Sequence, residues 1–156
     1  VWCQQHDDRD LLPRAARTFE PAALVSIESA DIVRFLMESD DPGPDVIDAV
    51  DHAVAWFRRY SIRGIRVEMV SAPELRTEWR TIAHDRVVVQ DPSAGPLWAR
   101  YYDLELNVPI FCGRDGRIVF SMAEVERERR AGYGWYSAAP QEILEYWERW
   151  KGRVRD

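Results

Sequence analysis

Apolar residues in the first 60 positions recur with the period of an α-helix. From residue 23 to 38 they are frequent enough to predict a mostly buried helix. From Asp45 to about Tyr60 they form a single stripe, which predicts an amphipathic helix. Residues 40–44, which contain two prolines and a glycine, predict the turn between these two helices.

Beyond Gly64 the apolar residues alternate or form short runs, which predicts strands. The expected strands span residues 65–70, 86–90, 97–102, 108–112 and 117–120. Asp115-Gly116 is a strong signal for a hairpin turn between the last two strands. Residues 71–84 are expected to form a variable surface loop, and Pro140 is expected to open a final helix that ends near Lys151.

These elements fit either the α+β class or an α-rich fold with a β appendage. The chain of 156 residues is long enough for one domain with a real core. We divide it into a mostly helical part, residues 1–62, and a part with short strands and small helices, residues 63–156.

Composition narrows the classes of partner. The net charge of −6 argues against a general nucleic-acid or membrane-surface binder, so an anionic ligand needs a local group of arginines. No apolar run approaches the roughly 20 residues that cross a membrane. Cys3 and Cys112 are far apart in the sequence, and we expect two free, buried thiols.

The segment 97–102 offers candidate chemistry for an acidic sugar. In a strand, Trp98, Arg100 and Tyr102 share one face. An aromatic ring stacks on the apolar face of a pyranose, and arginine binds a carboxylate with two parallel hydrogen bonds. The alternative is an arginine that packs among core aromatic rings.

Two other arginines occupy unusual positions. Arg114 lies in the predicted hairpin turn, either as a functional residue or as an exposed partner of Asp115. Arg34 lies among apolar residues of the first predicted helix, where it must reach a cleft or form a salt bridge with Glu38 or Asp31.

Asp7, Asp8 and Asp10 form an oxygen-rich stretch. Such carboxylates repel one another unless they are solvated or bridged by a hard cation such as Ca²⁺. They suit a calcium ion that takes its other ligands from water and an acidic substrate, or they form a solvated acidic loop.

Seven motifs follow one another along the chain in an order that resembles polysaccharide lyase family 10, the pectate lyases. They are WCQQHD at 2–7, RTFEP at 17–21, IVRFLM at 32–37, GIRVE at 64–68, PLWARYY at 96–102, PIFCGRDG at 109–116 and ERERRAGYGWY at 126–136. PLWAR, GRDG and ERRxGYxWY carry most of the specificity.

The resemblance implies a mainly α fold, part of an α/α toroid with short irregular strands and hairpins in its second half. It implies calcium-dependent β-elimination of α-1,4-polygalacturonate that yields 4,5-unsaturated uronides. The chain is then expected to be the C-terminal portion of a larger catalytic module, residues 1–156, and inactive in isolation. A monomeric, secreted protein, extracellular or periplasmic, is expected, with no nucleic-acid or membrane partner.

The same resemblance assigns roles to residues. Asp7 resembles the family's calcium-binding aspartate, and Arg100 and Arg114 resemble arginines that hold substrate carboxylates. The family uses an arginine as the base, which we place at Arg34 because it lies in the IVRFLM motif, with Arg66 as the other candidate. Trp98 and Tyr102 complete the predicted substrate-binding set.

Two other functions stay open at this stage. One is an α/α-barrel glycoside hydrolase that uses Asp7 with Glu20 or Glu28 as paired carboxylates. The other is a uronate-binding remnant without turnover, which binds through Trp98, Arg100 and Arg114.

Overall fold

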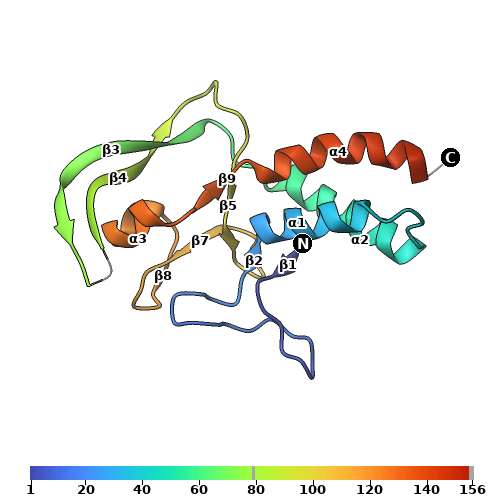
Figure 1. Ribbon diagram of the computed structural model, residues 1–156, viewed down its shortest axis with the longest axis horizontal. Helices are drawn as coiled ribbons and strands as arrows, with labels where there is room; N and C mark the ends of the chain where they lie inside the picture. Colours follow the sequence, from blue (N-terminus) through green and yellow to red (C-terminus); the bar gives the residue numbers. More distant parts are fainter. Residues whose placement is uncertain (79, 155–156) are drawn as a thin grey trace.

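Three helices form one layer of the molecule. The structure is a computed structural model that describes residues 1–78 and 80–154. Helices α1 (Ser26–Met37), α2 (Pro44–Arg59) and α4 (Ala139–Val154) pack against one another (Figure 1). None of the helices in the described residues is long and apolar enough to cross a lipid bilayer.

The predicted stripe explains the position of α2. Val50, Ala53, Val54 and Phe57 are fully buried, at the spacing that places them on one face of a helix. Pro44 is tolerated at the first turn because its missing N–H has no intrahelical partner there. The helix predicted over 45–60 is therefore confirmed.

A small antiparallel sheet lies beside the helices. Its strand order is β1-β2-β6-β7-β8, and a separate pair joins β5 to β9. The strands are β1 (Trp2–Cys3), β2 (Leu24–Val25), β5 (Trp98–Ala99), β6 (Tyr101–Tyr102), β7 (Pro109–Cys112), β8 (Ile118–Val119) and β9 (Tyr136–Ser137). Two short helical segments, η1 (Met122–Glu124) and α3 (Arg127–Gly132), follow β8.

Strand β6 separates two hydrophobic clusters. Tyr102 packs with the helices, whereas the preceding Tyr101 packs with Ile110, Phe111 and Trp135 on the other side. Successive side chains of a strand point to opposite faces, so this two-residue strand contributes to both clusters.

A long hairpin replaces the surface loop predicted at 71–84. Strands β3 (Ile65–Arg76) and β4 (Thr81–Gln90) pair from Ile65↔Gln90 to Arg76↔Thr81, with a register shift between Ser71 and Leu75. The loop prediction was wrong because Pro73 falls within this shift, where a proline is compatible with a strand. Residue 79, inside the predicted loop, lies outside the described residues.

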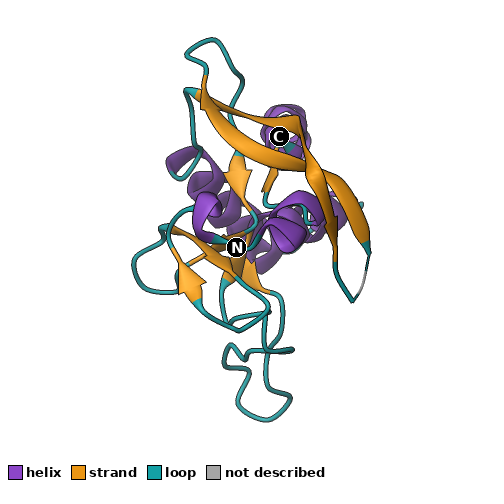
Figure 2. Ribbon diagram, turned by 90° about the vertical axis from the view of Figure 1, so that its left-hand side faces the viewer, coloured by secondary structure: helices purple, strands orange, loops and turns teal. Residues whose placement is uncertain are grey.

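The predicted strands at 65–70 and 86–90 are confirmed within this hairpin. Its two strands form a long curved ribbon (Figure 2), which extends away from the layer of α1, α2 and α4 (Figure 1). Helix α3 packs against β4.

The predicted fold class was wrong. The structure is 35% helical and 27% strand, with antiparallel sheets, so it is mixed and not mainly α or an α/α toroid. The long β3–β4 hairpin accounts for much of the difference, because its strands continue through most of residues 71–84, which were predicted to form a loop. The helix in the second part is also not small, because α4 has 16 residues.

Candidate functional site

Three guanidinium groups surround the ring of Phe19. The Cζ atoms of Arg17, Arg129 and Arg114 lie 4.9, 4.6 and 5.3 Å from the ring centroid. They come from the N-terminal segment, α3 and the turn between β7 and β8. Arginine is attracted to the face of an aromatic ring at such distances, so Phe19 holds together cations that would otherwise repel.

Tyr133 adds a fourth arginine to this group. Its ring centroid lies 4.3 Å from the Cζ atom of Arg129 and 4.9 Å from that of Arg100. The hydroxyl groups of Tyr133 and Tyr101 are hydrogen-bonded at 2.8 Å, which fixes the ring. We refer to Arg17, Arg100, Arg114 and Arg129 as the arginine cluster.

Arg129 is the buried centre of the arginine cluster, with only 4% of its surface exposed. Its Nε donates to the Cys112 carbonyl oxygen at 2.9 Å, and its Nη2 donates to the Phe19 carbonyl oxygen at 3.0 Å. No carboxylate in the described part of the chain forms a salt bridge with it. Its positive charge is therefore available to attract an anion to the neighbouring surface.

Each of the other three arginines is held by one glutamate. Arg17 Nε donates to Glu20 Oε2 and Arg114 Nε donates to Glu128 Oε2, both at 2.8 Å. Arg100 Nη2 donates to Glu28 Oε1. Arg100 Nε and Glu28 Oε2 are buried without a hydrogen-bond partner among the described residues, so this pair does not use all of its hydrogen-bonding capacity.

These contacts keep the arginine cluster charged. Hydrogen bonds from Arg17 and Arg114 lower the pKa of Glu20 and Glu128. The hydrogen bond to Glu128 likewise raises the pKa of Arg114 above its ordinary value. Four guanidinium groups and the three glutamates that pair with them carry a net charge of +1. Glu126, which accepts the Arg114 N–H, and Arg80, which pairs with Glu128, add one charge of each sign, so the site stays positive and suits an acidic ligand.

The GRDG turn positions Arg114. Gly116 has a φ of +83°, which favours glycine, and its N–H donates to the Gly113 carbonyl oxygen at 3.1 Å. A Cβ atom at Gly113 would lie 2.7 Å from Glu126 Oε2. The Arg114 N–H donates to the other oxygen of Glu126 at 2.6 Å, so the close approach of Glu126 fixes the turn. The predicted hairpin turn is confirmed.

Arg100 interrupts the strand predicted at 97–102. Its N–H donates to the Trp135 carbonyl oxygen at 2.8 Å, and its carbonyl oxygen accepts from the Ser26 N–H at 3.1 Å. The segment therefore forms two short strands, and the shared face predicted for three side chains is lost. The side chain of Arg100 reaches Tyr133 instead of Trp98.

Trp98 and Tyr102 are core residues, with 0% and 1% of their surface exposed. Trp98 Nε1 donates to the Phe57 carbonyl oxygen at 2.9 Å, and the Tyr102 hydroxyl donates to the Tyr60 carbonyl oxygen at 3.0 Å. The prediction that these rings stack on a sugar was wrong, because neither has a free face.

Arg34 lies outside the arginine cluster. Its Nη2 is 3.1 Å from Glu142 Oε2 of α4, and not paired with Glu38 or Asp31. Six residues separate it from Glu28, which corresponds to about 9 Å along α1 and about 240° around it. Arg100 and Arg114, the two arginines predicted to hold substrate carboxylates, thus belong to the arginine cluster, whereas Arg34, the predicted base, does not.

Arg66, the other candidate for the base, lies on β3. Its Nη1 is 3.2 Å from Asp91 Oδ2, and its Nη2 pairs with Glu68. These contacts hold it at the surface of the hairpin, with 47% of its side chain exposed.

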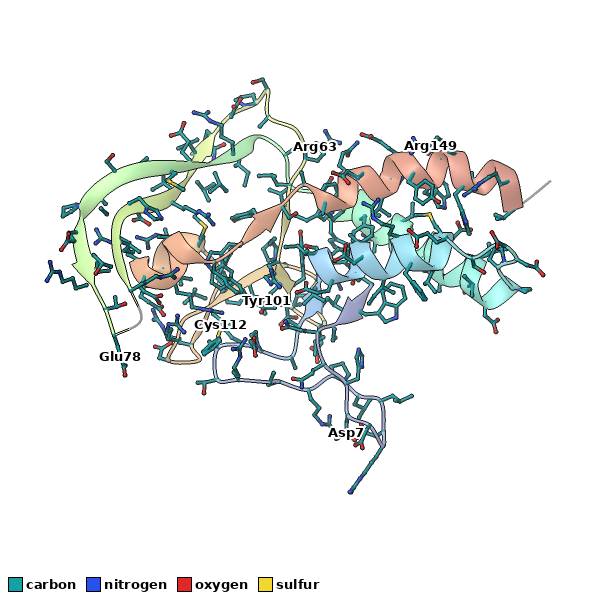
Figure 3. The ribbon with its side chains drawn as sticks, viewed as in Figure 1. Asp7, Arg63, Glu78, Tyr101, Cys112 and Arg149 are labelled. Atoms are coloured by element: carbon teal, nitrogen blue, oxygen red, sulfur yellow. The ribbon has the colours of Figure 1, made fainter. Side chains whose placement is uncertain are left out.

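Asp7 lies in the N-terminal loop, apart from Tyr101 and Cys112 in the body of the molecule (Figure 3). Its Oδ1 accepts from the N–H groups of Arg9 and Asp10 at 3.0 and 3.3 Å. Its Oδ2 lies 3.6 Å from Arg14 Nε. Asp7 therefore shapes a turn and forms an ion pair.

These residues do not fit a calcium ion by themselves. Calcium takes six to eight oxygen ligands. Within residues 1–78 and 80–154, no group of three or more His, Cys, Asp or Glu side chains could hold a metal ion.

Sequence reasoning missed Arg17, Phe19, Arg129 and Tyr133 as members of a site. All four lie in the RTFEP and ERERRAGYGWY motifs, which carry part of the family resemblance but assign no role to these residues. More than 100 residues separate the two motifs, and only the fold brings them together. Cys3 and Cys112 are free and buried, as predicted.

Comparisons with known proteins agree with the motif series. A family model described as pectic acid lyase matches residues 1–144. A family 10 polysaccharide lyase from Cellvibrio cellulosa is 27% identical, with a TM-score of 0.77, over 97% of this chain and 43% of that one. An aspartate-to-alanine mutant of a family 10 polysaccharide lyase from the same organism, in complex with trigalacturonic acid, is also 27% identical, with a TM-score of 0.76, over 96% and 43%.

No curated protein matches the chain significantly. By the coverage given above, the chain spans less than half the length of the two solved lyase structures.

Proposed function

Because the chain belongs to the pectic acid lyase family, we propose that its arginine cluster binds the carboxylates of polygalacturonate during β-elimination. The observation that carries this proposal is the convergence of four guanidinium groups on Phe19 and Tyr133. The complex of a relative with trigalacturonic acid supports the class of substrate.

The chemistry of the reaction explains the need for such a group. The proton at C5 of a galacturonate is a weak acid, because its removal adds charge to a sugar that already carries a carboxylate. The electron pair of the broken C5–H bond forms the C4=C5 double bond, while the C4–O bond breaks and the leaving oxygen takes up a proton. Guanidinium groups that contact the carboxylate offset the developing charge.

Arg100 and Arg114 are proposed to contact the reacting carboxylate. Their side chains are 20% and 34% exposed, whereas Arg129 is buried. A substrate carboxylate would share each guanidinium with the glutamate that already orients it, and Arg129 would add charge without contact.

We propose Arg17 as the base, in place of Arg34. Arg17 is the most exposed member of the arginine cluster, with 71% of its side chain accessible. Glu20 raises the pKa of Arg17 through a hydrogen bond, so in the substrate complex Arg17 must leave Glu20 and lose a proton to solvent before it can accept the C5 proton. Arg34 instead pairs with Glu142 in the layer of α1 and α4, outside the arginine cluster.

The product distinguishes this reaction from hydrolysis. The full-length protein that contains this chain, given polygalacturonate, is expected to produce ultraviolet-absorbing unsaturated ends. A hydrolase would release only saturated reducing ends, and Glu20→Gln or Glu28→Gln would then abolish turnover. Both glutamates are engaged by arginines in the structure, which disfavours hydrolysis.

Calcium dependence and the role of Asp7 stay predictions that one variant can test. Asp7→Asn keeps an oxygen that can accept the N–H groups of Arg9 and Asp10, so the loop is expected to fold normally. If Asp7 is a calcium ligand in the full-length enzyme, the calcium concentration for half-maximal activity should rise at least about tenfold. An unchanged calcium titration would remove Asp7 from the ligand set.

The isolated chain has a second proposed capacity, binding of uronate without turnover. All four arginines of the cluster lie within it, so it is expected to bind a galacturonate trimer in a calorimetric titration. Secretion and a monomeric state stay predictions from the family resemblance.

A further inference from the structure

Glu128 joins two arginines from different parts of the fold. Its side chain is 7% exposed, and its Oε2 accepts from Arg114 Nε at 2.8 Å. Its Oε1 lies 2.7 Å from Arg80 Nη2 and accepts a longer hydrogen bond, 3.2 Å, from Arg114 Nη2. One buried carboxylate is therefore shared by two guanidinium groups.

Arg80 reaches Glu128 from the end of the β3–β4 hairpin. The Thr77 N–H and hydroxyl group both donate to the Arg80 carbonyl oxygen at 2.9 Å, and the Arg80 N–H donates to Thr77 Oγ1 at 3.1 Å. Arg80 Nη2 also donates to the Glu128 carbonyl oxygen at 2.7 Å. These bonds fix both ends of the Arg80 side chain.

Gly132 provides the space through which Arg80 passes. A Cβ atom at Gly132 would lie 1.6 Å from Arg80 Nη2 and 2.0 Å from its Cζ atom. Any larger residue at the end of α3 would displace the guanidinium group from Glu128. The φ angle of Gly132 is not positive, so the absence of a side chain there serves this contact and not a special backbone conformation.

We propose that Arg80 is a positioning residue for substrate binding, because its charge offsets that of Glu128 and leaves Arg114 able to attract a uronate carboxylate. The inference rests on the proposed role of Arg114 in binding a uronate carboxylate. With Arg80 in place, two guanidinium groups and one carboxylate carry a net charge of +1. Without it, Arg114, which already donates to both oxygens of Glu128, faces that carboxylate alone, and the charge of this group falls to zero.

The loss of Arg80 should therefore weaken substrate binding more than it slows the chemical step. Arg80→Ala in the full-length protein is expected to raise KM for polygalacturonate roughly fivefold, an effect that one partly exposed charge can exert, with kcat within about twofold. Arg80→Lys retains the charge and should recover most of the affinity. If Arg80 only stabilised the hairpin, Arg80→Lys would not recover the affinity, and the change would not be confined to KM.

Gly132→Ala removes the same contact without removing the charged residue. Alanine favours a helix, so the variant is expected to fold. It should raise KM as Arg80→Ala does. The KM of the double variant should be no higher than that of either single variant, because all three variants remove the same interaction. Arg76→Ala is the matched control, since Arg76 lies on the same hairpin and its salt bridge among the described residues is to Glu74 at the surface.

Titration of the isolated chain with trigalacturonate separates this inference from the proposed function. If the unmodified chain and the full-length protein both fail to bind uronate, the proposed function fails. If they bind and Arg80→Ala binds equally well while folded, only the inference about Arg80 is overturned. An effect of Arg76→Ala as large as that of Arg80→Ala would also overturn it.

Discussion

Replacement of Arg17 by alanine is expected to lower kcat of the full-length protein by about 10³-fold, the scale of a lost general base. Arg17 is the exposed arginine next to the rings and cations that we propose surround the reacting sugar. KM should change little, because Arg100, Arg114 and Arg129 still attract the substrate. The measurement is the initial rate of formation of unsaturated ends over a range of polygalacturonate concentrations.

Arg34→Ala is the control for that experiment. Its ion pair with Glu142 joins two partly exposed side chains, and such pairs contribute about 0–1 kcal/mol to stability. Activity is expected to stay within about threefold of the unmodified protein. The opposite result, in which Arg34→Ala loses about 10³-fold of kcat and Arg17→Ala stays active, would identify Arg34 as the base, as the IVRFLM motif predicts.

Trp98→Ala is expected to destabilise the isolated chain by about 3–5 kcal/mol, which is typical for the loss of a large buried side chain. The ring is fully buried, packs edge-on against Phe57 and donates its only hydrogen bond to the Phe57 carbonyl oxygen. Unfolding in urea, followed by circular dichroism, measures the change in the free energy of unfolding.

Trp98→Phe distinguishes a core residue from a sugar-binding one. It keeps an aromatic ring and loses the hydrogen bond, so a smaller destabilisation and an unchanged affinity for trigalacturonate are expected. If Trp98→Phe keeps its stability but loses affinity for trigalacturonate, Trp98 is part of the substrate site.

Helix α2 and the GRDG turn could be predicted because local sequence determines them. The stripe that ends at Phe57 and the Asp115-Gly116 pair need no distant partner to specify their conformation. The arginine cluster could be predicted only in part. Arg100 and Arg114 belong to recognisable motifs, but the partners of Arg129 depend on contacts with Phe19 that no local pattern encodes.

Two errors have a common physical cause. Strict alternation along 97–102 assigned Trp98 and Arg100 to one face, but hydrogen bonds from distant segments break the strand at Arg100. Polar residues at 71–84 suggested a loop, but pairing with the opposite strand continues past Pro73. In both segments tertiary hydrogen bonds outweigh the preference of the local sequence.

The position of Tyr101 and Tyr102 on β6 has a consequence for cooperativity. Because these neighbouring residues belong to different clusters, the helical layer cannot separate from the sheet without exposing a buried tyrosine. The two clusters should thus unfold as one cooperative unit. Binding of an acidic sugar near Tyr133 should therefore also stabilise the helices, although they do not contact the sugar.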